Sequence, residues 1–136
     1  MSSQNLKKIM DDIEKDYQTE IVPITVSGRT LQCLRVADLD EIIFRRLETS
    51  DDHMFDLPFW GKIWEASIVL AAYLTAQPVR PGRKILEIGT GLGVSGLFAA
   101  AHGHEVTLSD HTVAILRFIR ANVLLNKLDN VSTINV

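Results

Sequence analysis

The chain has 136 residues, 46% of them hydrophobic, and a formal net charge of -3 at pH 7. This length and composition fit one globular domain with a core, and the acidic balance argues against a broad nucleic-acid-binding surface. No apolar run reaches the roughly 18 residues of a membrane span and the N-terminus has no signal core, so we expect a cytoplasmic protein without a membrane partner. The single cysteine, Cys33, is expected to pack in a strand.

The first 58 residues are predicted to form an extension made of a helix, a β-hairpin and a loop. Residues 5–17 place apolar side chains on one helical stripe between charges of both signs, which favours a helix covering its own domain over a membrane-surface helix. Residues 20–36 contain two β-rich runs around a glycine turn, and Pro23 places the first run near a sheet edge. A short helix over 38–47 and a polar loop over 48–53 complete the extension.

Residues 59–136 are predicted to form half of an α/β domain. A helix is expected to open at Leu57 and run to about Ala76, with Trp60 and Trp64 at its start as core aromatics or, for Trp64, as a ligand contact. Strand and helix patterns then alternate, and short right-handed crossovers give a parallel sheet. The expected strands are 84–88, 105–109 and 131–136, and the expected helices are 94–102 and 112–126.

Residues 84–96 contain the predicted ligand-binding loop of this half of the domain. A short apolar run typical of a buried strand precedes Gly89, Gly91 and Gly93, and an apolar helix starts at Val94. Glycine allows a positive φ and a close approach of the main chain to a ligand, while a helix start offers unpaired N–H groups to an anion. The pattern indicates a loop that cradles a nucleotide.

Two carboxylates narrow the choice of nucleotide. The spacing of Gly91, Gly93 and Gly96 matches a dinucleotide fingerprint, and Asp110 ends the second strand, where an acid binds ribose hydroxyls. Glu87 would repel a pyrophosphate, since like charges about 4 Å apart interact by roughly 4 kcal/mol at an intermediate dielectric. It favours a ligand with an ammonium group, which S-adenosylmethionine has, together with a ribose and no phosphate. A nicotinamide-dependent oxidoreductase is the less favoured alternative.

The residues resemble a known family. EIGTGLG at 87–93 and LSD at 108–110 resemble motifs one and two of the seven-β-strand, Rossmann-like S-adenosylmethionine-dependent methyltransferases. With the glycine loop, residues 63–74 and RANVLLN at 120–126 are similar to the protein-lysine methyltransferase group of that superfamily. The resemblance covers roughly 60–136 and implies a Rossmann-like parallel sheet.

The resemblance implies a set of cofactor-binding residues and names no catalytic residue. Main chain of the glycine loop would contact the methionine portion, Glu87 would orient its ammonium group, and Asp110 would accept both ribose hydroxyls. Trp64 would pack on the cofactor, and His111 would lie beside the adenine or be an exposed residue at a helix start. The full set is Trp64, Glu87, Gly89, Thr90, Gly91, Gly93, Asp110 and His111.

The family fold has seven strands in the order 3-2-1-4-5-7-6, and this chain supplies three of them by resemblance. The strand at 84–88 should then be central, with an open side that only the N-terminal hairpin or another chain could fill, which predicts a homodimer through that edge. The family's acidic-aromatic motif after the fourth strand, which faces the methyl acceptor, is absent. We therefore expect an N-terminal fragment that carries the cofactor-binding half and is inactive alone.

The favoured function is methyl transfer from S-adenosylmethionine to a protein lysine or another amine, with a small-molecule acceptor also open. The alternative is a non-catalytic cofactor-binding or interaction module of the same fold. No metal is expected, because Asp51, Asp52 and His53 are adjacent in sequence and do not converge on one ion without help.

Overall fold

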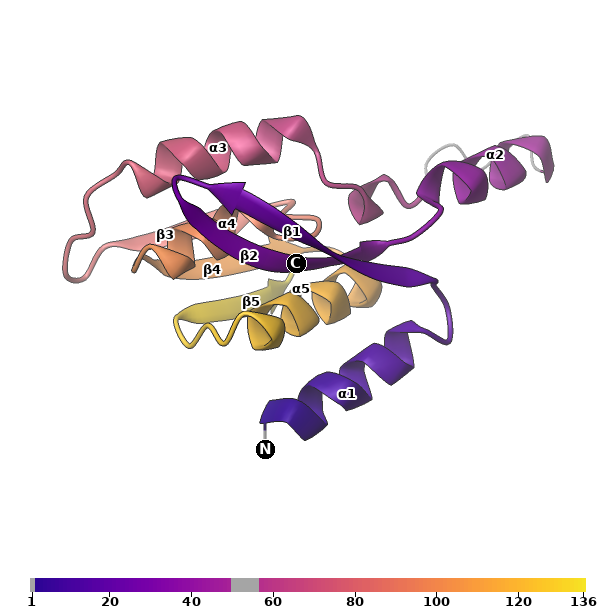
Figure 1. Ribbon diagram of the computed structural model, residues 1–136, viewed down its shortest axis with the longest axis horizontal. Helices are drawn as coiled ribbons and strands as arrows, with labels where there is room; N and C mark the ends of the chain where they lie inside the picture. The colour runs from indigo at the N-terminus through magenta and orange to yellow at the C-terminus, as the bar shows by residue number, and fades with distance from the viewer. Residues whose placement is uncertain (1, 50–56) are drawn as a thin grey trace.

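The computed structural model describes residues 2–49 and 57–136, and Figure 1 shows how its elements are arranged. In chain order they are α1 (Ser2–Ile13), β1 (Thr19–Val26), β2 (Arg29–Val36), α2 (Leu39–Thr49), the short 3-10 turn η2 (Phe59–Gly61), α3 (Glu65–Thr75), β3 (Lys84–Ile88), α4 (Val94–Ala101), β4 (Glu105–Asp110), α5 (Val113–Leu125) and β5 (Val131–Asn135). None of the helices in this part of the chain has both the length and the apolar character to span a bilayer.

The main sheet contains three parallel strands in the order β3-β4-β5. Helices α4 and α5 connect successive strands, so the three carboxyl ends meet at one edge of the sheet. Ile88 at the end of β3 pairs with Ser109, which directly precedes Asp110. The predicted α/β fold with a parallel sheet is confirmed.

The N-terminal hairpin forms a separate antiparallel sheet of β1 and β2. The hairpin itself was predicted correctly, but the possibility that it fills the open side of β3 is wrong. Pro23 removes a hydrogen-bond donor from β1, and the free edge of β2 is occupied by α5. Among the described residues β3 has no strand on that side, and Leu86 and Ile88 are 60% and 76% exposed. Association of two copies through this edge stays a prediction.

Two asparagines hold the hairpin: Asn122 of α5, and Asn126, which caps the C-terminus of that helix. Asn126 accepts a hydrogen bond from the Gln32 N–H and donates one to the Gln32 carbonyl, both at 2.8 Å. Asn122 pairs in the same way with Leu34, at 2.6 and 3.2 Å. The side-chain amides thus take the place of a neighbouring strand on the edge of β2.

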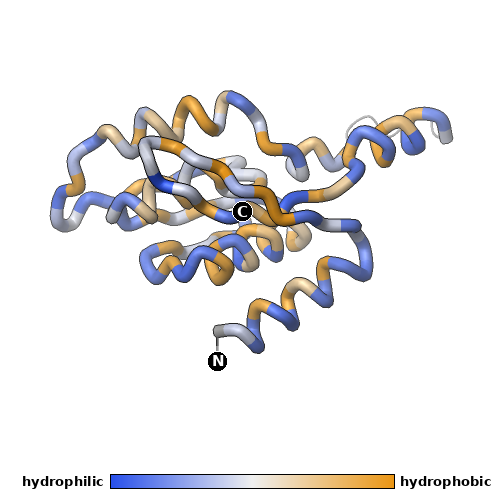
Figure 2. Tube along the Cα trace, in the orientation of Figure 1, coloured by the Kyte–Doolittle hydropathy of each residue, from blue (hydrophilic) through white to orange (hydrophobic). Residues whose placement is uncertain are grey.

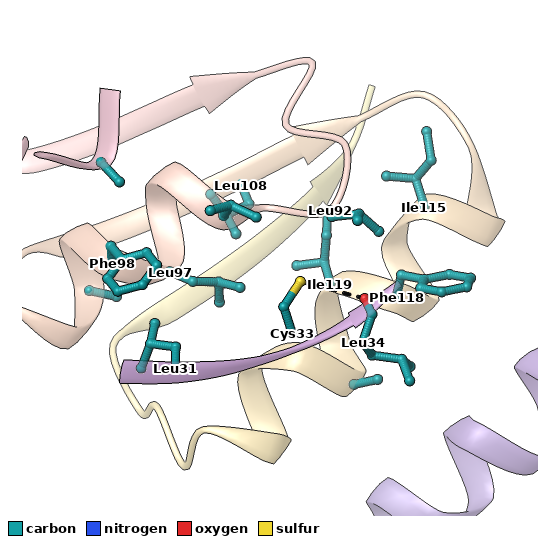
Figure 3. Packing of buried hydrophobic residues seen from close by; sticks show 14 of the residues in the cluster. Leu31, Cys33, Leu34, Leu92, Leu97, Phe98, Leu108, Ile115, Phe118 and Ile119 are labelled. Carbon is teal, nitrogen blue, oxygen red and sulfur yellow. Dashed lines mark hydrogen bonds between the residues drawn. The ribbon is translucent and has the colours of Figure 1, made fainter. Parts of the chain in front are cut away.

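Cys33 of β2 is 3% exposed and lies beside α5 in the hydrophobic core (Figure 3), which confirms its predicted packing role. The same burial raises the pKa of the Cys33 thiol to about 12.

The helices build a layer on the main sheet. Helix α4 packs on β4, α5 on β4 and β5, α3 on α4, and α1 on α5. Hydrophilic and hydrophobic residues alternate along α1 (Figure 2), and Ile13 on its apolar stripe is 2% exposed. The prediction that this amphipathic helix covers its own domain is confirmed, although the helix spans Ser2–Ile13 rather than 5–17.

The helix expected to open at Leu57 begins only at the start of α3, so that boundary is wrong. Lys62 and Trp64 both have an extended backbone. The φ and ψ angles are -97° and 147° at Lys62, and -86° and 139° at Trp64. A Cβ atom on Gly61 would lie 2.7 Å from Cγ2 of Val36. The extended segment therefore packs closely against β2, and this tertiary contact prevents the helix that the local sequence pattern predicts.

Helix α2 extends past its predicted end. Glu48 and Thr49, expected in a loop, belong to its last turn, where the Thr49 hydroxyl donates a hydrogen bond to the Arg45 carbonyl at 2.9 Å. The rest of the predicted loop, 50–53, lies outside the described residues. The division of the chain into 1–58 and 59–136 stays a prediction.

Candidate functional site

A cavity of about 590 Å³ lies beside the glycine loop, where β3 and β4 end. All the site residues predicted from the sequence line it: Trp64, Glu87, Gly89, Thr90, Gly91, Gly93, Asp110 and His111. Lys62 and Ile115 also line it and carry no signal in the sequence that singles them out. A larger groove of about 880 Å³ between α1, α5 and β5 contains none of the predicted residues.

The glycines of the loop serve two different needs. Gly89 has a φ of +66°, and a Cβ atom there would meet nothing within 4 Å, so its main chain is open to a ligand. Gly93 has a φ of +81°, and its Cβ would lie 3.1 Å from Cδ1 of Leu108. Gly96 is tighter still, with a Cβ 2.2 Å from Cδ2 of Leu108 and 2.7 Å from Oε2 of Glu87. The last two positions let α4 pack closely on the sheet.

Asp110 holds the glycine loop from the neighbouring strand. Its Oδ2 accepts a hydrogen bond from the Gly91 N–H at 2.9 Å, and its Oδ1 accepts from the main-chain N–H of His111 at 2.8 Å and lies 2.9 Å from Nδ1 of His111. The side chain is nearly buried, whereas that of His111 is exposed. The Thr90 N–H donates to the Ser109 carbonyl at 3.1 Å. Asp110 therefore shapes the loop, a role that the sequence did not indicate.

Glu87 brings a buried carboxylate to the floor of the cavity. Its Oε2 is shielded from solvent and has no hydrogen-bond partner, and the same is true of the Thr90 hydroxyl. Burial raises the pKa of Glu87, and hydrogen bonding to Thr90, to the main chain of Gly96 and to Ser95 only partly opposes this shift. The carboxylate of Glu87 therefore brings negative charge to the lining of the cavity, which favours a cationic group there.

The two tryptophans have different surroundings. Trp60 lines the cavity and also packs against the core, with its ring centroid 5.4 Å from that of Tyr17 and 5.2 Å from that of Phe118. Trp64 is 45% exposed, and its indole N–H donates to a main-chain carbonyl at 3.0 Å. Nζ of Lys62 lies 4.7 Å from the centre of the Trp64 ring. The Trp64 face is thus accessible to a cation at the rim of the cavity.

No three histidine, cysteine, aspartate or glutamate side chains are grouped as metal ligands within 2–49 and 57–136. The candidates considered from the sequence, Asp51, Asp52 and His53, lie outside these residues.

A family profile described as lysine methyltransferase matches residues 51–136. The chain belongs to the lysine methyltransferase family. This membership confirms the resemblance drawn from the sequence motifs.

Two relatives each match only part of this chain. EEF1A lysine methyltransferase 3 of Mus musculus is 39% identical over 67 residues, which make up 48% of this chain and 28% of the relative. Histone-arginine methyltransferase METTL23 of Rattus norvegicus is 47% identical over 65 residues, or 47% of this chain and 29% of the relative. The chain spans less than a third of the length of these relatives.

A solved structure shows the same fold. The SAM-dependent methyltransferase from Agrobacterium tumefaciens superposes with a TM-score of 0.57 at 22% identity, covering 88% of this chain and 33% of that one. The Rossmann-like architecture predicted for this member of the lysine methyltransferase family is confirmed.

Replacing Glu87 by Gln should stabilise the protein, because a neutral amide is easier to bury than an unpaired carboxylate. At neutral pH we expect a gain of about 1 to 3 kcal/mol in the free energy of unfolding, measured by urea denaturation. The matched control is Glu105→Gln on β4, because Glu105 is exposed and pairs with Lys84 at the surface; it should change stability by less than about 1 kcal/mol.

The gain from Glu87→Gln should depend on pH. In the folded protein Glu87 keeps its proton above the pKa it has in the unfolded chain, so wild-type stability falls as the pH rises through this raised pKa. The difference between variant and wild type should therefore shrink on acidification below the ordinary pKa of glutamate. A difference that stays constant with pH, or a destabilised variant, would contradict the assignment of an unpaired buried carboxylate.

Proposed function

We propose that the protein is an S-adenosylmethionine-dependent methyltransferase that acts on a nitrogen nucleophile of a protein, most specifically a lysine side chain. The observation that carries this proposal is the buried, unpartnered Oε2 of Glu87 in a cavity bordered by the glycine loop and Asp110. A carboxylate at that position suits a ligand with an ammonium group and opposes one with a pyrophosphate. Membership of the lysine methyltransferase family supports the same assignment.

The residues of the cavity fit the parts of this cofactor. S-adenosylmethionine supplies an electrophilic methyl group on a sulfonium. Glu87 would accept the ammonium group, and the open main chain at Gly89 would contact the methionine portion. Asp110 would accept ribose hydroxyls with the capacity that remains beside its bonds to the loop, and the exposed His111 ring would border the adenine. Trp64, which is 45% exposed where it lines the cavity, would pack on the cofactor.

The contribution of this chain to catalysis would be positioning. A loop fixed by hydrogen bonds before binding holds the donor in one orientation, which lowers the entropic cost of an in-line displacement. A lysine acceptor must lose its proton before it attacks, and we assign no residue to that step. The proposed acceptor class is supported by the family and by relatives named for lysine and arginine methylation. We also propose that the protein is cytoplasmic and forms a homodimer.

Ligand titration by calorimetry tests the cofactor assignment. The wild-type protein should bind S-adenosylhomocysteine and not NAD. The Asp110→Asn variant should bind S-adenosylhomocysteine about tenfold or more weakly, because a hydrogen bond from the glycine loop or from the ribose loses its charged acceptor. Asp129→Asn, which changes an exposed carboxylate in the turn before β5, serves as the control and should leave the affinity unchanged. Binding of NAD alone would refute the proposal in favour of an oxidoreductase.

Labelled-methyl transfer tests the acceptor. The protein is incubated with S-adenosylmethionine carrying a labelled methyl group and a protein extract, and the hydrolysed product is analysed for methylated amino acids. We expect the label in N-methyllysine. Label in methylarginine instead would keep the methyltransferase and overturn the lysine assignment. Cofactor binding without any transfer would support the non-catalytic alternative or the expectation that the 136 residues alone are inactive.

A further inference from the structure

Hydrogen bonds from several main-chain N–H groups hold the glycine loop in place. The Thr90 N–H donates to the Ser109 carbonyl, the Gly91 N–H to Asp110, and the Gly93 N–H to the Thr90 carbonyl at 2.9 Å. These bonds stay within β3, β4 and the loop that joins β3 to α4. Leu92, in the middle of the loop, is held from a different part of the molecule.

The partner of Leu92 is Asn122 of α5, whose side chain is completely buried. Its Nδ2 donates to the Leu92 carbonyl at 3.4 Å and to the Leu34 carbonyl at 3.2 Å, while its Oδ1 accepts from the Leu34 N–H at 2.6 Å. The Leu34 N–H can only donate, so the orientation of the amide is fixed by its partners. One side chain therefore bonds the hairpin and the glycine loop at the same time.

Asn126 provides an internal comparison. It lies one turn further along α5 and clasps Gln32 of the same strand through the same pair of hydrogen bonds. Its remaining bond runs from Nδ2 to the Asn122 carbonyl at 2.8 Å. Among the hydrogen bonds of the described residues, the Asn122 side chain reaches the loop and the Asn126 side chain does not.

The hairpin contributes no residue to the lining of the 590 Å³ cavity. The Asn122 amide links it to the glycine loop, and loss of the hairpin would leave that buried amide without its strongest partners and free to turn away from Leu92. The Leu92 side chain is itself 3% exposed, so the loop cannot readjust at this point without opening the core around it.

We propose that Asn122 is a positioning residue of the cofactor site: by bonding Leu34 and Leu92 together, it couples docking of the N-terminal hairpin to the shape of the glycine loop. The inference rests on the proposed function for its ligand, S-adenosylhomocysteine, but the coupling itself is a property of the free protein. Asn122 need not touch the ligand, since it acts through the main chain of the loop.

Paired variants test the coupling by affinity. Asn122→Ala should weaken binding of S-adenosylhomocysteine about tenfold or more, whereas Asn126→Ala should stay within about twofold of wild type, both measured by calorimetry well below the unfolding midpoints. A purely structural role for the clasp would lower both midpoints and leave both affinities near wild type. Equal weakening by the two variants, or no weakening by either, would overturn the proposal.

Hydrogen exchange tests the coupling without any ligand. Exchange at the Thr90 and Gly93 amides should be faster in Asn122→Ala than in Asn126→Ala, because only the first loses a bond to the loop. Equal exchange in the two variants would overturn the coupling. If the wild type binds no S-adenosylhomocysteine, the proposed function is wrong and the exchange result alone decides the coupling.

If Asn122→Ala does not fold, the wild type decides by NMR. On addition of S-adenosylhomocysteine, the side-chain NH₂ resonances of Asn122 should shift more than those of Asn126, because only Asn122 is bonded to the loop that the ligand contacts. Equal shifts, or none at Asn122 when the ligand binds, would refute the role.

Discussion

The hydrogen bond from the Gly91 N–H to Asp110 Oδ2 joins the ends of two neighbouring strands and gives the site its shape. It can form because β3 and β4 run parallel, with Ile88 opposite Ser109, so the loop after one strand meets the carboxylate at the end of the other. A hydrogen bond to a charged group is worth about 1.5 to 3 kcal/mol, more than a typical main-chain bond. The ligand-facing main chain is therefore ordered before a ligand arrives, and Asp110 serves the loop as well as the proposed ribose contact.

The position of Glu87 has the opposite effect, because it lowers the stability of the free protein. A carboxylate oxygen without a partner below the start of α4 disfavours the folded state, and hydrogen bonding to Thr90, Ser95 and Gly96 does not offset the burial of the carboxyl group. A ligand ammonium group in the cavity would favour the charged carboxylate. The same residue thus weakens the free protein and selects the proposed cofactor, as is common where binding sites give up stability for function.

The features that local sequence determines were predicted well. Alternating periodicity identified β3, α4, β4, α5 and β5 to within a residue or two, and the glycines marked the loop because positive φ has few other sources. Glu87 and Asp110 were found because a carboxylate at a strand end carries a strong electrostatic signal. These inferences needed no contact between segments far apart in the sequence.

The features that depend on distant contacts were missed. The late start of α3 follows from the packing of Gly61 on Val36, which no helical pattern reveals. Asn122 and Asn126 occur four residues apart and match an ordinary polar helix surface, so their pairing with the edge of β2 could not be deduced. The packing of the Trp60 ring on Tyr17 and Phe118 likewise depends on residues far away in the sequence.

The most direct test of the central claim is an NMR titration of the Glu87 side-chain carboxyl with and without S-adenosylhomocysteine. The account predicts a pKa above the ordinary value for glutamate in the free protein, because of burial, and a clear fall when the ligand is bound, because its ammonium group favours the charged carboxylate. A Glu87 pKa that saturating S-adenosylhomocysteine leaves unchanged would contradict the account.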